Sequence, residues 1–135
     1  MATIPLVHGY DRRSVFAYRE GRPVAFDDFL RDTIRLAARL PQRRHVLNLC
    51  ADRYRFAVGF SAALLREQVS LLPPNDTPDL IERLVALYPD VYCLTDGPAA
   101  PVALETVSFP ESAGGGPEVP AVPAFPEAQW AAILF

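Results

Sequence analysis

Five side chains with polar or thiol groups stand where the sequence predicts the carboxyl ends of parallel strands: Cys50, Asp52, Asn75, Thr95 and Asp96. In open α/β sheets, ligands bind beyond the carboxyl ends of the strands, so these residues are the binding candidates. The simpler expectation is a helix cap for Asp52 and a turn for Asn75 and Asp96. We therefore expect structural roles for the polar side chains ahead of ligand binding.

Cys50 is the best candidate for a nucleophile, because it ends a predicted central strand just before a helix N-terminus. A helix N-terminus lowers the pKa of a thiol and so favours the reactive thiolate. However, no histidine stands in a position to act as its base. Cys50 and Cys93 both lie in apolar runs, so we expect buried, reduced cysteines in a cytoplasmic protein.

Other residues that often carry chemistry lack the surroundings they would need. His8 and His45 are single, and with only two cysteines they form no zinc-binding spacing. The run Gly114–Gly116 has neither the preceding strand nor the following helix of a phosphate cradle. Ser61 is predicted within a helix and Ser70 within a strand, and no G-x-S-x-G elbow occurs. We therefore assign no catalytic, cofactor-binding or metal residue to this chain.

The elements that would position these residues begin with a β-hairpin, formed by strands at 15–18 and 24–26 around a turn at 20–23. A helix follows, capped by Asp27 or Asp28 and ended by Pro41. Buried strands at 46–50, 69–72 and 91–94 then alternate with two helices, capped by Asp52 and Thr77. The predicted apolar stripes of the three helices are, in order, Phe29, Ile34, Leu36, Ala37 and Leu40; Phe56, Ala57, Phe60, Ala63 and Leu64; and Leu80, Ile81, Leu84, Val85 and Leu87.

Alternation of this kind, with short links, predicts βαβ units and right-handed crossovers. The expected fold class is α/β: a Rossmann-like three-layer fold with a mostly parallel sheet, preceded by an N-terminal β-hairpin. The expected domain organisation is an α/β subdomain over 1–109, a Pro/Gly-rich loop over 110–128 and a strand over 129–135.

After Gly97 the regular alternation of predicted strands and helices ends, although 102–107 is predicted as one more strand. Five prolines and three consecutive glycines between 110 and 126 predict a mobile loop. By contrast, the apolar run 129–135 predicts a strand that docks on the sheet. We expect that strand to bury its large side chains, which are Trp130, Ile133, Leu134 and Phe135.

Charge and hydropathy exclude some classes of protein. The net charge is −3, whereas a nucleic-acid-binding module would usually carry a basic stripe. The adjacent Arg43 and Arg44 are expected in a solvated loop rather than a phosphate site. No apolar run approaches the roughly 18 residues of a membrane span, and no signal peptide is recognisable at the N-terminus. We thus expect a cytoplasmic protein with no nucleic acid partner and no membrane span.

The order of these segments resembles the opening of the adenylate-forming enzyme superfamily. Val15–Leu30 is similar to a "…dGr…lTYaeL" hairpin and helix, Leu36–Leu40 to "…rlAaaL", and Val46–Asp52 to the next strand and its acidic turn. Phe56–Arg66 is similar to "…f.vaflAvlkaG", Val69–Asn75 to "a..vPlNp", and Ala131–Phe135 to "…a.ilfTSGSTG.PK". One departure is the pair Glu67-Gln68, which replaces a small residue and glycine. It indicates a divergent bacterial subgroup, similar to AMP-ligases and acyl- or aryl-CoA synthetase-like proteins.

The resemblance implies that this chain is the N-terminal part of a larger enzyme. In that family a carboxylic acid, fatty or aryl, reacts with ATP and magnesium to give an acyl-adenylate. The thiol of coenzyme A or of a carrier protein then takes the acyl group. The phosphate loop and the other catalytic motifs would lie after Phe135, so the chain alone is expected to be inactive and to have the remainder of the synthetase as its partner.

The alternative is a non-catalytic, Rossmann-like binding or dimerisation module. Its basis is the apolar strand at 131–135, which would otherwise present an unpaired edge. A homodimer is therefore also expected under this alternative, and a small molecule bound at the strand ends is a third hypothesis.

Overall fold

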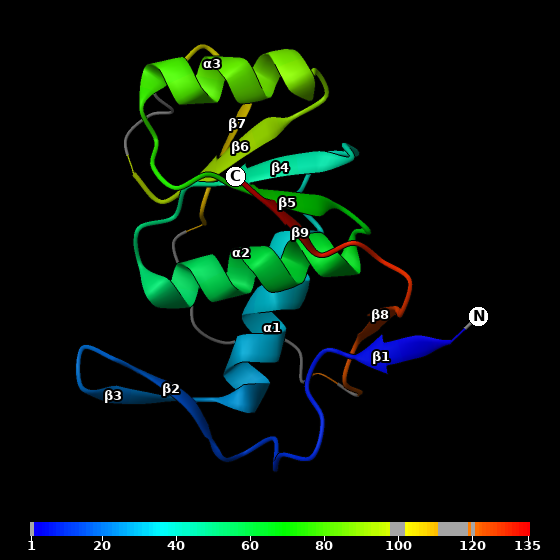
Figure 1. The fold of residues 1–135 in the computed structure, drawn as a ribbon. Coiled ribbons are helices and arrows are strands. Elements are labelled where there is room, and N and C mark those ends of the chain that lie inside the picture. The colour runs from blue at the N-terminus through cyan, green and yellow to red at the C-terminus, as the bar shows by residue number, and fades with distance from the viewer. Residues whose placement is uncertain (1, 98–101, 111–118, 120) are drawn as a thin grey trace.

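The computed structural model describes residues 2–97, 102–110, 119 and 121–135, and its centre is a parallel sheet. The sheet has five strands in the order β7-β6-β4-β5-β9 (Figure 1). All four neighbouring pairs are parallel. The strands are β4 (His45–Asn48), β5 (Val69–Leu72), β6 (Tyr92–Thr95), β7 (Thr106–Ser108) and β9 (Ala132–Leu134).

Helices cover both faces of this sheet. Helix α2 (Arg53–Leu65) lies on one face with α1 (Phe26–Ala37) beyond it, and α3 (Pro78–Leu87) lies on the other (Figure 1). The strand, helix, strand alternation predicted from the sequence is therefore confirmed. The fold is Rossmann-like α/β, preceded by an N-terminal hairpin.

Burial on both faces explains why the strands read as continuous apolar runs. Val46 pairs with Tyr92, and both belong to the cluster on the α2 side. Leu47, which follows Val46 in β4, pairs with Leu71, and both belong to the cluster on the α3 side. β4 thus gives alternate residues to two separate cores.

Helix α2 differs from the predicted stripe, because it is buried on two sides. Val58 and Ala62 are fully buried, whereas Phe56 and Phe60 of the predicted face are only half-buried. The helix lies between the sheet and α1, so no single stripe describes it. Gly59 allows the close approach: a Cβ there would lie 2.6 Å from Leu94 Cδ2.

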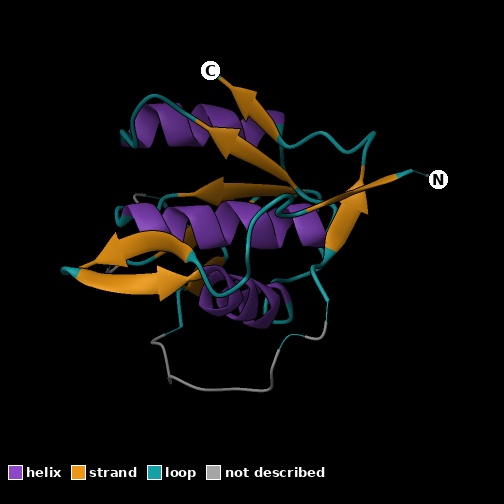
Figure 2. Ribbon diagram, turned by 90° about the horizontal axis from the view of Figure 1, so that it is seen from below, coloured by secondary structure: helices purple, strands orange, loops and turns teal. Residues whose placement is uncertain are grey.

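The hairpin consists of β2 (Val15–Arg19) and β3 (Arg22–Ala25), joined by a tighter turn than predicted. Glu20 and Gly21 are its two central residues, with φ of 52° and 76°, as a type I′ turn requires. Figure 2 shows the hairpin and the β1–β8 ribbon on opposite sides of α1.

The predicted caps of α1 were wrong, because the helix begins earlier, at Phe26. Ala25 is the N-cap residue, and Asp27 and Asp28 lie in the first turn. The Asp28 carboxylate accepts a hydrogen bond from the Ala25 N–H at 3.4 Å. Acidic residues suit this turn because they interact with the positive end of the helix dipole.

Two residues of the predicted helical stripes are exposed. Ile34 of α1 is 38% exposed, whereas Leu30, outside the predicted stripe, is completely buried against the core. Leu87 is 68% exposed, since α3 meets the sheet mainly through Ile81 and Leu84. In both helices the buried residues therefore differ from the stripe that the apolar pattern predicted.

Part of the predicted mobile loop is a strand. β8 (Ala124–Pro126) pairs antiparallel with β1 (Thr3–Pro5), an N-terminal strand that the sequence did not reveal. The Leu6 N–H extends this ribbon by donating to the Pro123 carbonyl at 2.8 Å. Gly114–Gly116 lie outside the described residues, and the strand predicted at 102–107 is confirmed only in its last part, by β7.

The prediction that the final strand docks on the sheet is confirmed, but most of its predicted burial is wrong. β9 pairs parallel with β5 along the register Ser70–Ala132. Ile133 packs against the α3-side cluster. Trp130, Leu134 and Phe135 remain 70%, 77% and 45% exposed, because β9 is the outermost strand.

Candidate functional site

The carboxyl end of the sheet brings four of the five sequence candidates into one region. Adjacent strands β4 and β6 supply the loops that meet there, with Asn48 opposite Leu94 in register. Asp96 connects the two loops: one carboxylate oxygen accepts the Ala51 N–H at 2.9 Å and the other accepts the Asp52 N–H at 3.0 Å. We call Asn48, Cys50, Asp52, Arg55, Thr95 and Asp96 the carboxyl-end cluster.

Asp52 is a helix cap, as predicted. Its carboxylate accepts the Arg55 N–H of α2 at 2.8 Å. The same carboxylate oxygen lies 3.5 Å from the Arg19 guanidinium, which comes from the hairpin. That guanidinium also lies over the Tyr54 ring, 4.7 Å from its centroid. Asp52 therefore contacts both Arg19 of the hairpin and the first turn of α2.

The Asp96 carboxylate is almost buried, with 8% of its side chain exposed. Burial alone would raise its pKa, but the N–H groups of Ala51 and Asp52 outweigh that effect and the pKa is lowered. The Arg55 guanidinium, 3.9 Å away, adds to the stabilisation of the charged form. Asp96 is thus an ionised structural acceptor, not a proton donor.

Asn48 was not among the predicted candidates, yet it is central to the cluster. Its side-chain amide donates to the Phe56 carbonyl at 3.0 Å, and its oxygen accepts the Cys50 N–H at 3.2 Å. The Thr95 hydroxyl oxygen accepts the Gly97 N–H at 3.0 Å in a local turn. An asparagine at the end of an apolar strand was the signal that could have revealed Asn48.

Cys50 does not have the properties of a nucleophile. It is buried, and burial together with the nearby Asp96 carboxylate raises the pKa of its thiol to about 12. The expected effect of the α2 N-terminus is therefore overcome. Burial also raises the pKa of Cys93 to about 11, and both cysteines are free thiols.

Asn75 has a separate, local role. Its side-chain oxygen accepts hydrogen bonds from the N–H and the hydroxyl of Thr77, at 3.2 and 2.9 Å. Thr77 is the N-cap residue of α3, but its own side chain forms no cap hydrogen bond. The predicted turn role of Asn75 is confirmed, and the predicted cap by Thr77 is confirmed in position only.

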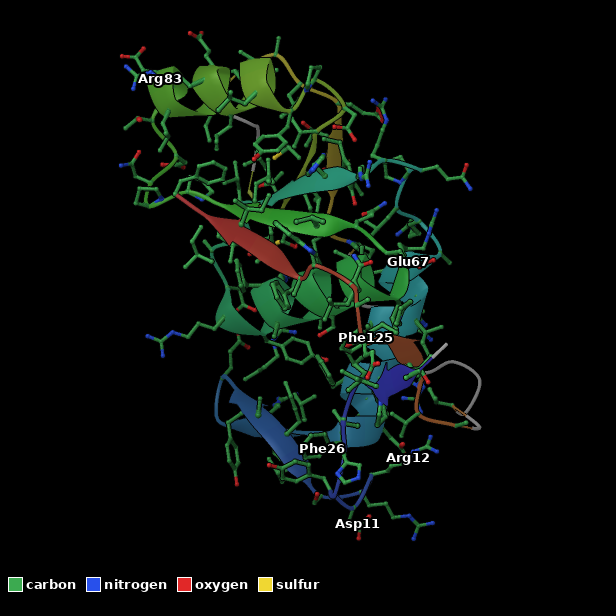
Figure 3. The ribbon with its side chains drawn as sticks, turned by 45° about the vertical axis from the view of Figure 1, so that its right-hand side comes forward. Asp11, Arg12, Phe26, Glu67, Arg83 and Phe125 are labelled. Carbon is green, nitrogen blue, oxygen red and sulfur yellow. The ribbon has the colours of Figure 1, made fainter. Side chains whose placement is uncertain are left out.

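The opposite, amino end of the sheet contains a hollow of about 550 Å³. Arg43 lies on its wall and pairs with Glu105. The residues that line the hollow are Gln42, Arg43, Arg44, Leu65, Arg66, Glu67, Gln68 and Asp90. Glu67, at the end of α2, is labelled in Figure 3.

Two lining residues, neither of them a site candidate from the sequence, bind backbone groups at this end. The Arg66 guanidinium donates to the carbonyls of Ala37 and Leu40, at 2.6 and 2.8 Å. The Gln68 side chain is buried, donating to the Pro41 carbonyl at 2.7 Å and accepting the Tyr92 hydroxyl at 2.6 Å. These groups satisfy carbonyls at the end of α1, where helices leave acceptors unpaired.

His45 also lies at this end, as the first residue of β4. Its Nδ1 atom is 2.9 Å from the Asp90 carboxylate, and its ring lies 4.6 Å from that of Tyr88. The other Asp90 oxygen accepts the Arg44 N–H at 2.9 Å. His8 is exposed in the segment before the hairpin, so the two histidines do not belong to one arrangement of contacts.

The remaining candidates are dispersed. Ser61 is buried in α2 and Ser70 in β5, and the Ser70 hydroxyl has no hydrogen-bond partner among the described residues. Within the described residues, no group of three or more His, Cys, Asp or Glu side chains could hold a metal ion. In the same part of the chain, no helix has the length and apolar character needed to cross a membrane.

No protein-family model matches the sequence, and no curated protein matches it either.

Proposed function

We propose that this chain forms the N-terminal subdomain of an adenylate-forming ligase. The ligase would activate a fatty or aryl acid with ATP and magnesium and then transfer the acyl group to the thiol of coenzyme A or a carrier protein. The observed order of hairpin, helix and alternating strands supports the segment-by-segment resemblance. A cytoplasmic location is part of the proposal.

The observation that carries the proposal is the position of β9. Its residues resemble the approach to a phosphate loop, and it runs parallel to β5 with Leu134 beside Leu72. Its carboxyl end therefore lies at the same end of the sheet as the carboxyl-end cluster. In open α/β sheets this is the end where ligands bind, so a phosphate loop after Phe135 would begin there.

The backbone at Glu67 is compatible with the resemblance. The resemblance has a small residue and a glycine just after the second helix, and this chain has Glu67-Gln68 instead. Glu67, at the position of the small residue, has a φ of 55°, the left-handed conformation that favours glycine. The Gln68 N–H donates to the Ala63 carbonyl at 2.9 Å, which completes a Schellman cap. The helix thus ends in a left-handed turn without a glycine at either position.

The residues of this chain would contribute structure, not chemistry. The Asp96 oxygens accept two backbone amides and Asp52 caps α2, so these carboxylates do not fit a site for magnesium and a nucleotide. We therefore derive no catalytic step from them. The chain alone is expected to release no pyrophosphate.

The first test is the coding sequence that follows the codon for Phe135. The proposal requires an in-frame Thr/Ser/Gly-rich segment followed by a lysine. A longer protein that includes this segment should then release pyrophosphate from ATP only when a fatty or aryl acid is present. An unrelated sequence after Phe135 would overturn the proposal.

The chain of residues 1–135 serves as the matched control in the same assay. With ATP, magnesium and the same acids it should show no acid-dependent pyrophosphate release, because the motifs that the resemblance assigns to adenylyl transfer would follow Phe135. Turnover by this chain alone would contradict the assignment of the chemistry to later residues.

A further inference from the structure

The two edge strands of the sheet differ in a way that points to an occupant for one of them. Both edge strands have three residues, but β7 is polar, with Thr106 and Ser108, and Glu105 beside it pairs with Arg43. Among the described residues, β9 has no such protection: Trp130 and Leu134 are 70% and 77% exposed. An unprotected apolar edge strand is a template for pairing with another strand.

The register of β9 identifies which backbone groups are free. The Ala131 carbonyl accepts the Ser70 N–H at 3.0 Å, and Ala132 is the partner of Ser70. In a parallel ladder, alternate residues direct their N–H and C=O groups to the neighbouring strand. Ala131 and Ile133 therefore face β5, while Ala132 and Leu134 direct their backbone groups away from the sheet.

We infer that a second copy of the chain pairs antiparallel with β9, across a two-fold axis at Ala132. At that axis Ala132 would exchange two hydrogen bonds with Ala132 of the second copy, as the two residues of a hydrogen-bonded antiparallel pair do. Trp130 of each copy would then lie opposite Leu134 of the other copy, on one face of a continuous sheet. Aromatic and aliphatic side chains opposite one another stabilise such pairs.

Self-complementarity is the reason for choosing a second copy as the occupant. Residues 128–135 include no charged side chain, so two copies of this strand meet without repulsion between like-charged side chains. The same three positions serve both copies, as an isologous interface requires. The small contact area implies a weak, reversible dimer. The inference uses only β9 and β5 and does not depend on the ligase proposal.

Sedimentation velocity of the 135-residue chain from about 1 to about 200 μM should show a monomer–dimer equilibrium, typical of a small interface. Leu134→Arg adds a charge beside the axis on an exposed side chain, so it should weaken dimerisation at least about tenfold without unfolding the monomer. Thr106→Arg is the matched control on β7 and should leave the dimer unchanged. A wild-type chain that stays monomeric, or one that forms open polymers, would overturn the inference.

Disulfide formation tests the axis itself. The two residues of a hydrogen-bonded antiparallel pair have Cα atoms about 5.5 Å apart, within the range that a disulfide spans. Under mild oxidation, Ala132→Cys should give a covalent dimer, whereas Thr106→Cys, which also faces outward, should not. Native Cys50 and Cys93 are buried and should not contribute. Equal crosslinking of the two variants would contradict the axis at Ala132, whatever the coding sequence shows about a ligase.

Discussion

The two ends of the sheet are stabilised by opposite kinds of side chain. At the carboxyl end, short acceptors bind backbone N–H groups: Asp96 those of Ala51 and Asp52, and Asp52 that of Arg55. At the amino end, long donors bind backbone carbonyls: Arg66 and Gln68 reach the residues that end α1.

Chain direction explains this difference. In βαβ units, the carboxyl end of a strand leads to the N-terminus of a helix, where N–H groups are free. The amino end follows the C-terminus of a helix, where carbonyls are free and positive side chains are favoured. Polar clusters at sheet ends can therefore be purely structural, even at the end where α/β proteins bind ligands.

The largest expected effect is at the carboxyl end, where Gly59 lets α2 approach Asn48 and Leu94. Gly59→Val should lower the free energy of unfolding by about 3 kcal/mol, because the new side chain overlaps Leu94 and the Asn48 amide. Gly97→Ala is the control, since its Cβ would meet only the Thr95 hydroxyl, at 3.6 Å. Urea denaturation measures both, and equal effects would mean that close packing is not what fixes α2.

The amino end should respond most strongly at Gln68. Gln68→Leu leaves the Pro41 carbonyl and the buried Tyr92 hydroxyl without partners, so we expect a loss of about 2 kcal/mol. Tyr92→Phe in the Gln68→Leu background should recover part of this loss, because it removes the unpaired hydroxyl. A double-mutant cycle by urea denaturation checks this, and strictly additive effects would contradict the coupling.

Acid should weaken the carboxyl end more than the amino end. The lowered pKa of Asp96 means that its stabilisation is complete above the ordinary pKa of 3.8 and disappears as the pH falls through the lower pKa of the folded state. Asp96→Asn should cost about 1–2 kcal/mol near neutral pH, and the difference from wild type should shrink in acid.

The control for Asp96 is Asp90 at the amino end, whose pKa is also lowered although 41% of its side chain is exposed. Burial would raise that pKa, but the hydrogen bonds from His45 and the Arg44 N–H outweigh it. Solvent screens this carboxylate, so Asp90→Asn should change the acid dependence less. Thermal unfolding from neutral pH downward compares the two, and a larger change for Asp90→Asn would reverse the ranking.

The smallest expected effect is a gain in stability at the amino end. Glu67→Gly removes the strain of a left-handed residue but adds freedom to the unfolded chain, so the net gain should be about 0.5 kcal/mol. Glu67→Val should instead destabilise, since a β-branched residue resists this conformation. A loss of stability in Glu67→Gly would show that the Glu67 side chain itself contributes.

Local patterns predicted the elements well and their surroundings poorly. The strands at β4, β5 and β6 and the cap by Asp52 follow from apolar runs and single polar residues. The burial of Ile34 and Trp130 was predicted wrongly, because it depends on which side of α1 is covered and on β9 being the outermost strand. β1 was missed because its partner, β8, lies more than a hundred residues away.

The sequence by itself determined the α/β class, the hairpin and the acceptors that follow the strands, because these depend on residues close together in the chain. Only the tertiary structure decided that Asp96 holds the start of α2, that Gln68 joins Tyr92 to the end of α1, and that β9 is an edge strand. Each of these contacts joins segments separated by at least 24 residues, and the partner is fixed by strand order. No local pattern contains that order, since it results from how two faces of one sheet are covered at once.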